Sequence, residues 1–372
     1  MKILQVVHSF PPYIGGIENH TYNLAKELVV LGNKVEVITA AHPKAKAIEE
    51  VKGFKVRRYF SLNAPWFSSV RYIPFLAFRL LFEDADLYCS HGYGSIMPFC
   101  TALAAFIKRK PFIFTLHGYP KQKGISGLLQ AVYKIFLASF FLRIARKVIT
   151  VTDANVQEIS KEVDPKKIVI IPNGVDEKKF YCKEKIGKQR GNEILYVGRL
   201  DRYKGIDSLI RAFAKLKEKS LDARLRIVGS DEGVRGELEA LARDLGVDVE
   251  FTEVEYEKVR EVYERATAVV LPSHYEGLSL ILLEAIACER PMLSTPVGEA
   301  PKLFAEVYGE HARKFLFKSE GELSEKLAHI LENKKEYAEI AEKARTKLIK
   351  RYSWKEVARR TLKVYEGAQS PA

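Results

Sequence analysis

Cysteine is scarce in this sequence. The 372 residues include four cysteines, which lie far apart and form no Cys-x-x-Cys pair or Cys/His cluster: Cys89, Cys100, Cys182 and Cys288. This spacing argues against a zinc site and against a disulfide framework. Such cysteine use suits a reducing cytoplasm, which is where we expect the protein to be.

Long apolar runs are also missing. The nearest candidate for a membrane-spanning helix, residues 128–142, contains Lys134 and is shorter than the roughly 20 residues that such a helix needs. The apolar run within residues 1–10 is too short, and too soon followed by prolines, for a secretory signal. We therefore expect a folded globular protein.

The chain is long for a single domain. Its 372 residues exceed what one hydrophobic core usually holds, which favours two domains.

Acidic residues are scarce in the first half of the chain. Residues 1–190 hold 29 lysines and arginines against 15 acids, whereas residues 191–372 hold 31 against 32. The excess positive charge therefore lies entirely in the first half. It indicates an anionic partner, such as nucleic acid, an acidic membrane surface or a phosphorylated substrate, although a lysine-rich face can also serve solubility alone. Nucleic acid is disfavoured as a partner, because the basic residues accompany no recognised binding motif and no repeated aromatic platform.

Buried strands alternate with amphipathic helices along the whole chain. In the first half the pattern predicts a helix at residues 18–31 and strands at residues 2–8, 34–40, 112–117, 148–152 and 167–171. After a polar, lysine-rich stretch it predicts further strands at residues 193–197, 224–228, 247–252 and 268–271. This is typical of an α/β protein with two doubly wound parallel sheets, one domain over residues 1–184 and the other over residues 185–354. Because such sheets bind ligands at the carboxyl ends of their strands, we expect the site in a cleft between two facing domains.

Glycines and basic residues follow two of the predicted strands. Gly15 and Gly16 stand between the first strand and the first helix, where a backbone without side chains can approach an anion. The spacing is not a Gly-x-Gly-x-x-Gly fingerprint, and a Gly-Gly pair alone is more often a tight loop. In the second half, Arg199 and Lys204 lie between a strand and a helix. These four residues are candidates for phosphate binding, although a basic pair of this kind can equally be solvated.

Two histidines end predicted strands. His91 lies in YCSHGYG and His117 in TLHGYP. A lone histidine is usually structural, but two imidazoles at strand tips that face a cleft favour contact with a substrate. Asp84 and Asp86 form an Asp-x-Asp sequence that can bind a metal, but they precede their strand and so belong to the wrong end of the sheet. We therefore predict no metal site.

Two carboxylates lie within the apolar middle of the segment SHYEGLSLILLEAIACERP. Glu276 and Glu284 are separated by seven uncharged residues. Glu276 is expected in a loop, because Gly277 follows it, and Glu284 about a turn inside the next helix. Eight positions along a helix correspond to about 80° of rotation, so both acids can reach one neighbouring volume. The start of this helix, at Leu280 and Ile281, can offer backbone N–H groups to an anion there.

Several of these segments together resemble one family. The segments GGIENH, IPNGVD, VGRLDRYKG, RIVGSDEG and EGLSLILLEAIACERP occur in the order expected of the family 4 glycosyltransferases, which are retaining enzymes with the two-domain GT-B fold. The similarity covers nearly the whole chain. It implies two facing Rossmann-like domains with the active site in the cleft, the first binding the acceptor and the second the nucleotide-sugar donor. It also implies that the last helix, about residues 355–372, packs back on the first domain.

The resemblance assigns roles to the candidate residues. Glu276 would bond hydroxyl groups of the donor sugar, and Glu284 would hold the ribose hydroxyls of the nucleotide. Arg199 and Lys204 would stabilise the negative charge that develops on the departing diphosphate. The amides around the Gly-Gly pair, and those at the start of the helix that contains Glu284, would contribute to this.

The resemblance also extends to the sugar and the nucleobase. His117 matches a histidine beside the donor sugar and the acceptor, and Val254 belongs to the loop that faces the nucleobase. No general base is assigned, since retention in this family is attributed to same-face attack without an established protein nucleophile. This sequence departs from the family at Glu253, Glu299 and Lys302, where glycine, glycine and an acid are common, so base preference and donor orientation stay open.

We therefore expect a metal-independent hexosyltransferase that uses a UDP-, GDP- or ADP-linked sugar and needs no cofactor. The basic first half and the aromatic stretches at residues 64–82 and 128–147 favour a lipid or lipid-linked sugar as the acceptor, reached at the cytoplasmic face of the membrane. A small soluble sugar or sugar phosphate is the alternative acceptor. A sugar-nucleotide epimerase is the alternative enzyme with the same fold.

Overall fold

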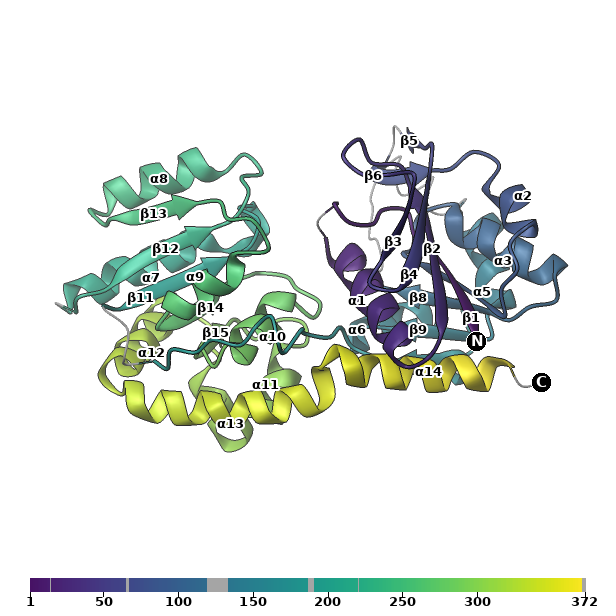
Figure 1. The fold of residues 1–372 in the computed structure, drawn as a ribbon. Helices are drawn as coiled ribbons and strands as arrows, with labels where there is room; N and C mark the ends of the chain where they lie inside the picture. The colour runs from purple at the N-terminus through teal and green to yellow at the C-terminus, as the bar shows by residue number, and fades with distance from the viewer. Residues whose placement is uncertain (14, 65–66, 119–132, 187–190, 220, 370–372) are drawn as a thin grey trace. The chain divides into compact units, whose positions relative to one another are not determined.

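A computed structural model describes the whole chain except residues 14, 65–66, 119–132, 187–190, 220 and 370–372 (Figure 1). The chain forms two compact units. Unit 1 comprises residues 1–173 and 354–372, and unit 2 comprises residues 174–353. Each unit has a mainly parallel sheet with helices on both faces, which confirms the expected α/β architecture.

The main sheet of unit 1 has eight strands in the order β10-β9-β8-β7-β1-β2-β4-β3. Their bounds are β1 Lys2–Val6, β2 Lys34–Ala40, β3 Ile48–Val51, β4 Phe54–Tyr59, β7 Leu87–His91, β8 Phe112–Leu116, β9 Lys147–Thr150 and β10 Ile168–Ile170. All neighbouring strands pair in parallel except β3 and β4. A separate antiparallel hairpin joins β5, Leu62–Ala64, to β6, Phe67–Tyr72.

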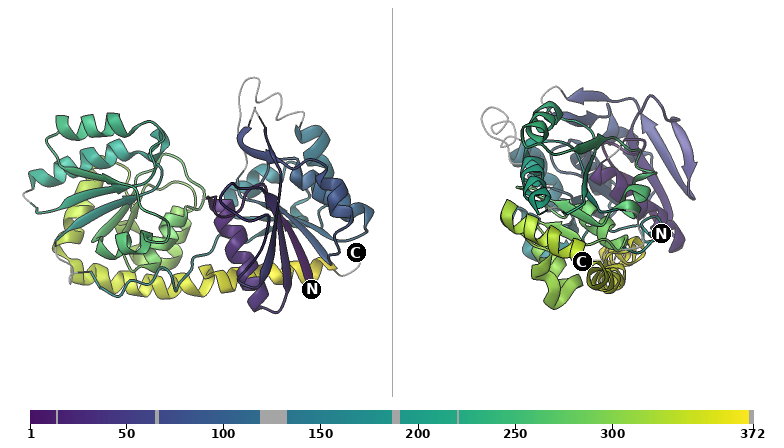
Figure 2. Two further views of the ribbon diagram at one scale, coloured as in Figure 1. Left: turned by 45° about the horizontal axis from the view of Figure 1, so that its top comes forward. Right: turned by 90° about the vertical axis from the view of Figure 1, so that its left-hand side faces the viewer.

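Helices cover both faces of this sheet (Figure 1 and Figure 2). Successive side chains of a strand point to opposite faces, so Ile3 of β1 packs in one core and Leu4 in the other. The first core contains α1, Gly16–Val30, and α14, Trp354–Gln369. The second contains α2, Leu76–Leu81, α3, Met97–Ile107, and the continuous helix formed by η1, Lys134–Ala138, and α5, Ser139–Ile144. The short helices α6, Asp153–Ile159, and η2, Pro165–Lys167, join the last two strands.

The sheet of unit 2 has five parallel strands in the order β13-β12-β11-β14-β15. The strands are β11 Glu193–Val197, β12 Arg224–Val228, β13 Val249–Thr252, β14 Ala268–Leu271 and β15 Met292–Ser294. The helices are η3 Arg202–Lys204, α7 Ile206–Glu218, α8 Arg235–Asp244, α9 Val259–Arg265, α10 Leu280–Ala287, α11 Ala300–Tyr308, η4 Gly309–Lys314, α12 Glu320–Glu332 and α13 Lys334–Tyr352. From β11 the chain first adds strands on one side and then on the other, so the order reverses between β11 and β14. In open α/β sheets ligands bind at such a reversal.

The division between the units falls after residue 173, not after residue 184 as expected from the sequence. Val175 and Phe180 already belong to the core of unit 2. Arg345 of α13 donates hydrogen bonds to the carbonyl oxygens of Phe180 and Glu177, both at 3.0 Å. The lysine-rich stretch that suggested the boundary therefore comes after the chain has joined the second core.

The last helix of the chain belongs to unit 1. Trp354, Val357 and Tyr365 of α14 share a core with Ile3 of β1 and Leu24 of α1. The chain thus leaves unit 2 at the end of α13 and completes unit 1 with α14. Among the described residues, no helix is both long and apolar enough to span a membrane.

Candidate functional site

Two loops of unit 2 bring a lysine and a glutamate together beside the reversal of strand order. Lys204, at the end of η3 after β11, places its Nζ atom 2.7 Å from Oε1 of Glu276, in the loop after β14. The hydroxyl of Ser273 donates to the same carboxylate oxygen at 2.9 Å. The two charged side chains are mostly buried, with 17% and 12% of their surface exposed. Two of the candidate residues therefore form one polar cluster, and Ser273 joins it.

Two glycines let the backbones around this cluster approach closely. A Cβ atom on Gly205 would lie 2.2 Å from the carbonyl oxygen of Pro272. On Gly298 it would lie 2.3 Å from the carbonyl oxygen of Gly277 and 2.4 Å from that of Glu276. Both glycines also have positive φ, +62° and +56°, which other residues rarely adopt. Side chains are thus excluded at the two points where neighbouring loops press against the loop that carries Glu276.

Two of the three departures from the family pattern, Glu299 and Lys302, lie at the start of α11. Glu299 is the N-cap of α11, and its backbone N–H donates to the carbonyl oxygen of Gly277 at 3.1 Å. Lys302 is exposed in the first turn of α11. Glu299 is therefore held beside the backbone that follows Glu276, whereas Lys302 faces solvent.

Arg199 follows β11 but lies outside the Lys204 cluster. Its side chain is 66% exposed, and its guanidinium nitrogens lie 3.9 Å from the carboxylates of Asp201 and Glu232. Exposed ion pairs at this distance hold a side chain only weakly. The hydroxyl of Tyr196 fixes the backbone of Arg199 by donating to its carbonyl oxygen at 2.8 Å. The guanidinium can therefore turn toward an anion while its backbone stays in place.

The second acid of the apolar segment lies inside α10. Glu284 is only 6% exposed, and it accepts hydrogen bonds from the hydroxyls of Tyr263 at 2.9 Å and Tyr256 at 3.3 Å. Burial raises the pKa of Glu284 to about 7, while the bond from Tyr263, the charge of Lys179 and the bond from Tyr256 act in the opposite direction. The ammonium of Lys179 also lies 3.3 Å from the centre of the Tyr256 ring. A ligand hydroxyl that donates a hydrogen bond to Glu284 must share the carboxylate with Tyr256 or displace the Tyr256 hydroxyl, which makes the longer of the two bonds.

Backbone groups at the start of α10 lie between the two acids in the sequence. The N-cap residue Ser279 makes no side-chain hydrogen bond to the helix, so its hydroxyl does not occupy the first amides at Leu280 and Ile281. Both of those side chains, like Val254 after β13, are partly buried against the core of unit 2. Uncapped amides at a helix start are suited to binding an anion.

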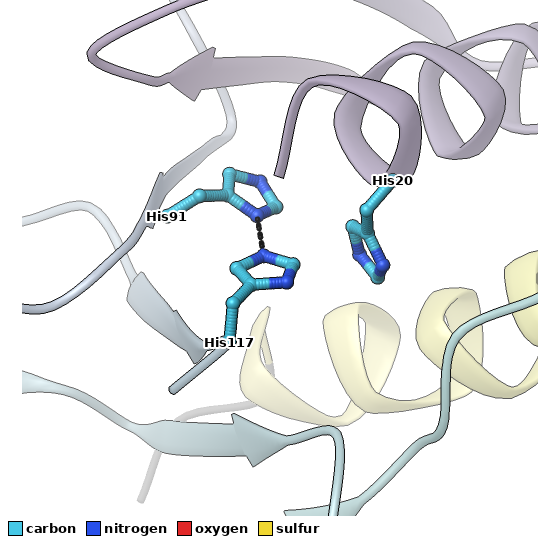
Figure 3. A group of neighbouring side chains, drawn as sticks. All are labelled: His20, His91 and His117. Atoms are coloured by element: carbon cyan, nitrogen blue, oxygen red, sulfur yellow. Dashed lines mark hydrogen bonds between the residues drawn. The ribbon is translucent and has the colours of Figure 1, made fainter. Parts of the chain in front are cut away.

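Three histidines gather at the carboxyl edge of the unit 1 sheet (Figure 3). His91, the last residue of β7, pairs in register with Thr115 of β8, so His117 follows two residues later on the same face. Nδ1 of His91 and Nε2 of His117 are 3.2 Å apart. His20 of α1 packs edge-on against His117, with 4.5 Å between the ring centres. The two predicted histidines are thus neighbours, and His20 is a third that the sequence analysis did not identify.

Burial keeps these three imidazoles neutral at pH 7. It lowers the pKa of His20 to about 4, and it also lowers the pKa values of His91 and His117, which their neighbouring imidazoles lower further. Nδ1 of His20 lies 2.9 Å from Oδ1 of Asn173, and this nitrogen carries the proton because the amide oxygen only accepts. Neutral imidazoles can hydrogen-bond a sugar hydroxyl. One nitrogen from each ring, the three lying within 4.8 Å of one another, could also hold a metal ion that prefers nitrogen ligands, such as Zn²⁺.

The Gly-Gly pair lies at the start of α1, but an acid lies beside it. Gly15 is the N-cap, and a Cβ atom on it would be 2.3 Å from Oε2 of Glu18. The hydroxyl of Ser9 donates to the other oxygen of this carboxylate. Gly16 has open space around the position of a Cβ atom. An anion that approaches the first amides of α1 therefore meets the negative charge of Glu18.

Comparison with protein families accounts for both units. A family model described as Glycosyltransferase Family 4 matches residues 14–179, and one described as Glycosyl transferases group 1 matches residues 177–347. The chain belongs to the family 4 glycosyltransferases. The family expected from the sequence motifs is thereby confirmed, and with it the activity class of a glycosyltransferase.

Individual relatives match this glycosyltransferase over nearly its whole length. An uncharacterized glycosyltransferase of Methanocaldococcus jannaschii is 29% identical, and the match covers 98% of each chain. The phosphatidylinositol N-acetylglucosaminyltransferase gpi3 subunit of Schizosaccharomyces pombe is 26% identical over 96% of this chain and 78% of its own length. HepE of Anabaena, solved in complex with UDP, is similar in structure with a TM-score of 0.79 at 22% identity, covering 99% of this chain and all of that one. The structural likeness shows the GT-B fold.

Proposed function

We propose that this glycosyltransferase transfers a hexose from a UDP-linked sugar to a hydroxyl group of a lipid or lipid-linked sugar, with retention of the anomeric configuration. The observation that carries the proposal is the cluster of Lys204, Ser273 and Glu276 at the reversal of strand order. Glu284 lies in α10, the helix that follows Glu276 in the chain. A cation and two carboxylates suit the diphosphate, the sugar hydroxyls and the ribose of such a donor.

The role of the basic groups follows from the charge that develops in the reaction. Breaking the bond between the anomeric carbon and the diphosphate leaves negative charge on the phosphate and positive charge on the sugar. Lys204, Arg199 and the first amides of α10 are the groups of unit 2 that would stabilise the leaving group. Lys204 is already fixed by Glu276, so little rearrangement is needed for its ammonium to meet a phosphate oxygen.

The role of the acids follows from hydrogen-bond chemistry. A carboxylate only accepts, so Glu276 is suited to hydroxyl groups of the hexose and Glu284 to those of the ribose. The hydroxyls of Tyr263 and Tyr256 donate to Glu284, and a ribose hydroxyl would displace the longer bond, from Tyr256, or share the carboxylate with it. Val254, which follows β13, would contact the nucleobase.

His117 is assigned a hydrogen-bonding role in unit 1 and not the role of a cation. Burial lowers its pKa, so the ring is neutral at pH 7 and can bond a hydroxyl of the sugar or the acceptor. We assign no protein nucleophile and no general base, and the acceptor hydroxyl would attack from the face that the diphosphate leaves. The backbone amides of Gly15 and Gly16 keep their proposed role of binding the diphosphate. The diphosphate would have to approach these amides beside the carboxylate of Glu18.

The choice of donor and acceptor has support from the relatives. HepE was solved in complex with UDP-glucose as well as UDP, which favours a UDP-linked donor. The relatives from two yeasts are named for transfer of N-acetylglucosamine to phosphatidylinositol, which favours a lipid acceptor. A basic first half is the charge that an anionic lipid surface attracts.

Two measurements on the purified protein test this function. In a thermal-shift panel of UDP, GDP and ADP, the matching nucleotide at 100 times its Kd should add about 2.7 kcal/mol of stability if it binds only the folded state. Incubation with UDP-glucose and UDP-N-acetylglucosamine, with and without detergent-dispersed phosphatidylinositol, should give slow hydrolysis alone and a glycolipid with acceptor. Conversion of the donor to another nucleotide sugar would identify an epimerase, and stabilisation by GDP or ADP but not UDP would contradict the proposed donor.

A further inference from the structure

Large apolar side chains are exposed on one helical layer of unit 1. This layer consists of α2, α3 and the η1–α5 helix, whose inner sides share one core. Seven of its side chains are more than half exposed, and we call them the phenylalanine face: Phe75, Phe78, Phe82, Phe106, Ile107, Ile135 and Phe136. Single exposed apolar residues are normal in proteins, but a contiguous set of this kind marks an interaction surface.

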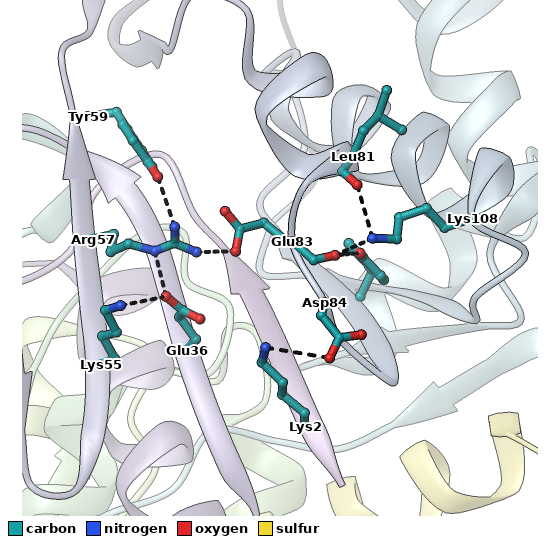
Figure 4. Close-up of polar contacts among 10 residues, drawn as sticks. Lys2, Glu36, Lys55, Arg57, Tyr59, Leu81, Glu83, Asp84 and Lys108 are labelled. Atoms are coloured by element: carbon teal, nitrogen blue, oxygen red, sulfur yellow. Dashed lines mark hydrogen bonds and ion pairs between the residues drawn. The ribbon is translucent and has the colours of Figure 1, made fainter.

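Contacts between the helices show that the face is contiguous. The rings of Phe78 and Phe82 lie 5.0 Å apart between centres. Lys108, directly after α3, donates through Nζ to the carbonyl oxygens of Leu81, at 3.0 Å, and Glu83, the two residues that flank Phe82 (Figure 4). The end of α2 is therefore tied to the end of α3, where Phe106 and Ile107 lie.

The same surface continues onto the η1–α5 helix. The ring of Phe106 lies 6.5 Å from that of Phe140, which is partly buried on α5. Phe136 precedes Phe140 by four positions, and residues four apart share one side of a helix. A ligand that covers α2 therefore also meets α3 and the start of the η1–α5 helix.

The segment of the chain that carries the face is strongly basic. Residues 71–147 contain 11 lysines and arginines but only three acids. Glu83, one of the acids, forms an ion pair with Arg57 of β4 (Figure 4). Another acid, Asp86, accepts a hydrogen bond from the backbone N–H of Lys2 at 2.7 Å. Arg109 and Arg143 are exposed beside the ends of α3 and α5.

We propose that the phenylalanine face docks unit 1 on the surface of an anionic lipid bilayer. The inference rests on the proposed lipid acceptor and names the surface by which the enzyme would reach it. Aromatic side chains surrounded by lysine and arginine suit the boundary between headgroups and acyl chains, where rings enter the apolar region and cations meet phosphate. Phenylalanine and arginine are also common in protein interfaces, but lysine is depleted there, and six of the 11 basic residues of this segment are lysines.

The face extends from one edge of the sheet toward the other, since Phe82, Phe106 and Ile107 end the helices that precede β7 and β8 and so lie toward the amino edge. The η1–α5 helix runs back toward the start of β9, so its first residues, Ile135 and Phe136, lie toward the carboxyl edge of the sheet. His117 lies at this same edge, directly after β8. A bilayer in contact with the face therefore extends to the edge of unit 1 at which the acceptor is expected.

Flotation of the full-length protein with lipid vesicles tests the proposal. Vesicles of phosphatidylcholine, alone or with about one third phosphatidylglycerol, are compared at about 0.1 M and about 1 M salt. The protein should float with the anionic vesicles, much less with the neutral ones, and less at high salt. Equal flotation with both, or none with either, would overturn the proposal.

Variants of exposed side chains identify the surface without disturbing the core. The triple variant Phe78→Ser, Phe82→Ser, Phe106→Ser should weaken binding to anionic vesicles about tenfold or more, because its rings no longer enter the headgroup region. Replacement of Arg109 and Arg143 by glutamine should weaken it about 30-fold, at about 1 kcal/mol for each charge. Val30→Ser on α1 and Lys343→Gln on α13, both exposed elsewhere, are the matched controls and should leave binding unchanged. Loss of binding in the controls but not in the face variants would place the contact elsewhere.

Two further outcomes separate this proposal from its alternatives. If the wild type is a dimer that the triple variant dissociates, and neither binds vesicles, the face is an interface between copies and the proposal is wrong. If the wild type binds anionic vesicles but transfers sugar only to soluble acceptors, the docking surface stands and the proposed lipid acceptor fails. If it transfers sugar to detergent-dispersed lipid but binds no vesicle, the proposed function stands and the docking surface fails.

Discussion

The ammonium of Lys204 lies 2.7 Å from Oε1 of Glu276, although the two residues are 72 positions apart in the chain. The contact joins the loops that follow β11 and β14, on the two sides of the reversal of strand order in unit 2. It gives a mostly buried acid and a mostly buried cation their partners. A nucleotide-sugar donor would engage both, the lysine by its diphosphate and the glutamate by its hexose.

Removal of the Lys204 charge should slow transfer. We expect Lys204→Met to lower kcat about 10²- to 10³-fold, as is typical when one group that stabilises a developing anion is lost. Lys215→Met is a matched control, because Lys215 also pairs with a glutamate, Glu320 at 3.1 Å, but on the exposed surface of α7. Steady-state kinetics with a UDP-sugar would measure both. Transfer by the Lys204 variant within a few-fold of wild type would remove this lysine from the mechanism.

Transfer should survive excess EDTA. Among the described residues, no cluster of acids that could hold a metal ion lies at the carboxyl edge of either sheet. Lys204, Arg199 and backbone amides would therefore stabilise the negative charge of the diphosphate. Activity assayed before and after chelation, then after return of Mn²⁺ or Zn²⁺, measures this. Complete loss that Mn²⁺ restores would show that the leaving group depends on a metal. Loss that only Zn²⁺ restores would point to the three histidines of unit 1.

The burial of Glu284 predicts a specific dependence of stability on pH. Its pKa of about 7 in the folded protein exceeds the value of about 4.3 expected in the unfolded chain. The folded state therefore binds more protons between these values, so this contribution is most favourable below about pH 4 and is lost as pH rises toward 7. Relative to Glu284→Gln, the wild type should lose about 3 kcal/mol of unfolding free energy across this range. Urea unfolding of both proteins at several pH values checks it, and a difference that is constant with pH would contradict it.

Several strands with mainly apolar residues could be predicted from the sequence. The residues of β2, β11, β12 and β14 match the expected ranges, because strands buried on both faces carry few polar residues. The strand β3 was not expected, since its sequence IEEV is polar and it pairs antiparallel at the sheet edge. The apolar stretch at residues 128–142 lies partly outside the described residues, which resume at Tyr133, and η1 begins there at Lys134.

The charged residues of the donor site could be identified from motifs, but their partners could not. Glu276 and Glu284 belong to one recognisable segment, whereas Tyr263 bonds Glu284 only because α9 and α10 share a core. A buried tyrosine needs a partner for its hydroxyl, which signals such a contact without naming the partner. His20 was missed for a similar reason, since its position in α1 gives no indication that it packs beside His117.

The division of labour between the two acids is the central claim, and UDP binding by Glu276→Gln and Glu284→Gln tests it most directly. Isothermal calorimetry on the two variants should give a UDP Kd within a few-fold of wild type for Glu276→Gln, because its contacts are to the sugar. For Glu284→Gln the Kd should rise about tenfold or more, because a charged acceptor for the ribose hydroxyls is lost. In parallel assays, Glu276→Gln should nearly abolish transfer despite its unchanged UDP binding. An equal loss of UDP affinity in both variants would contradict the account.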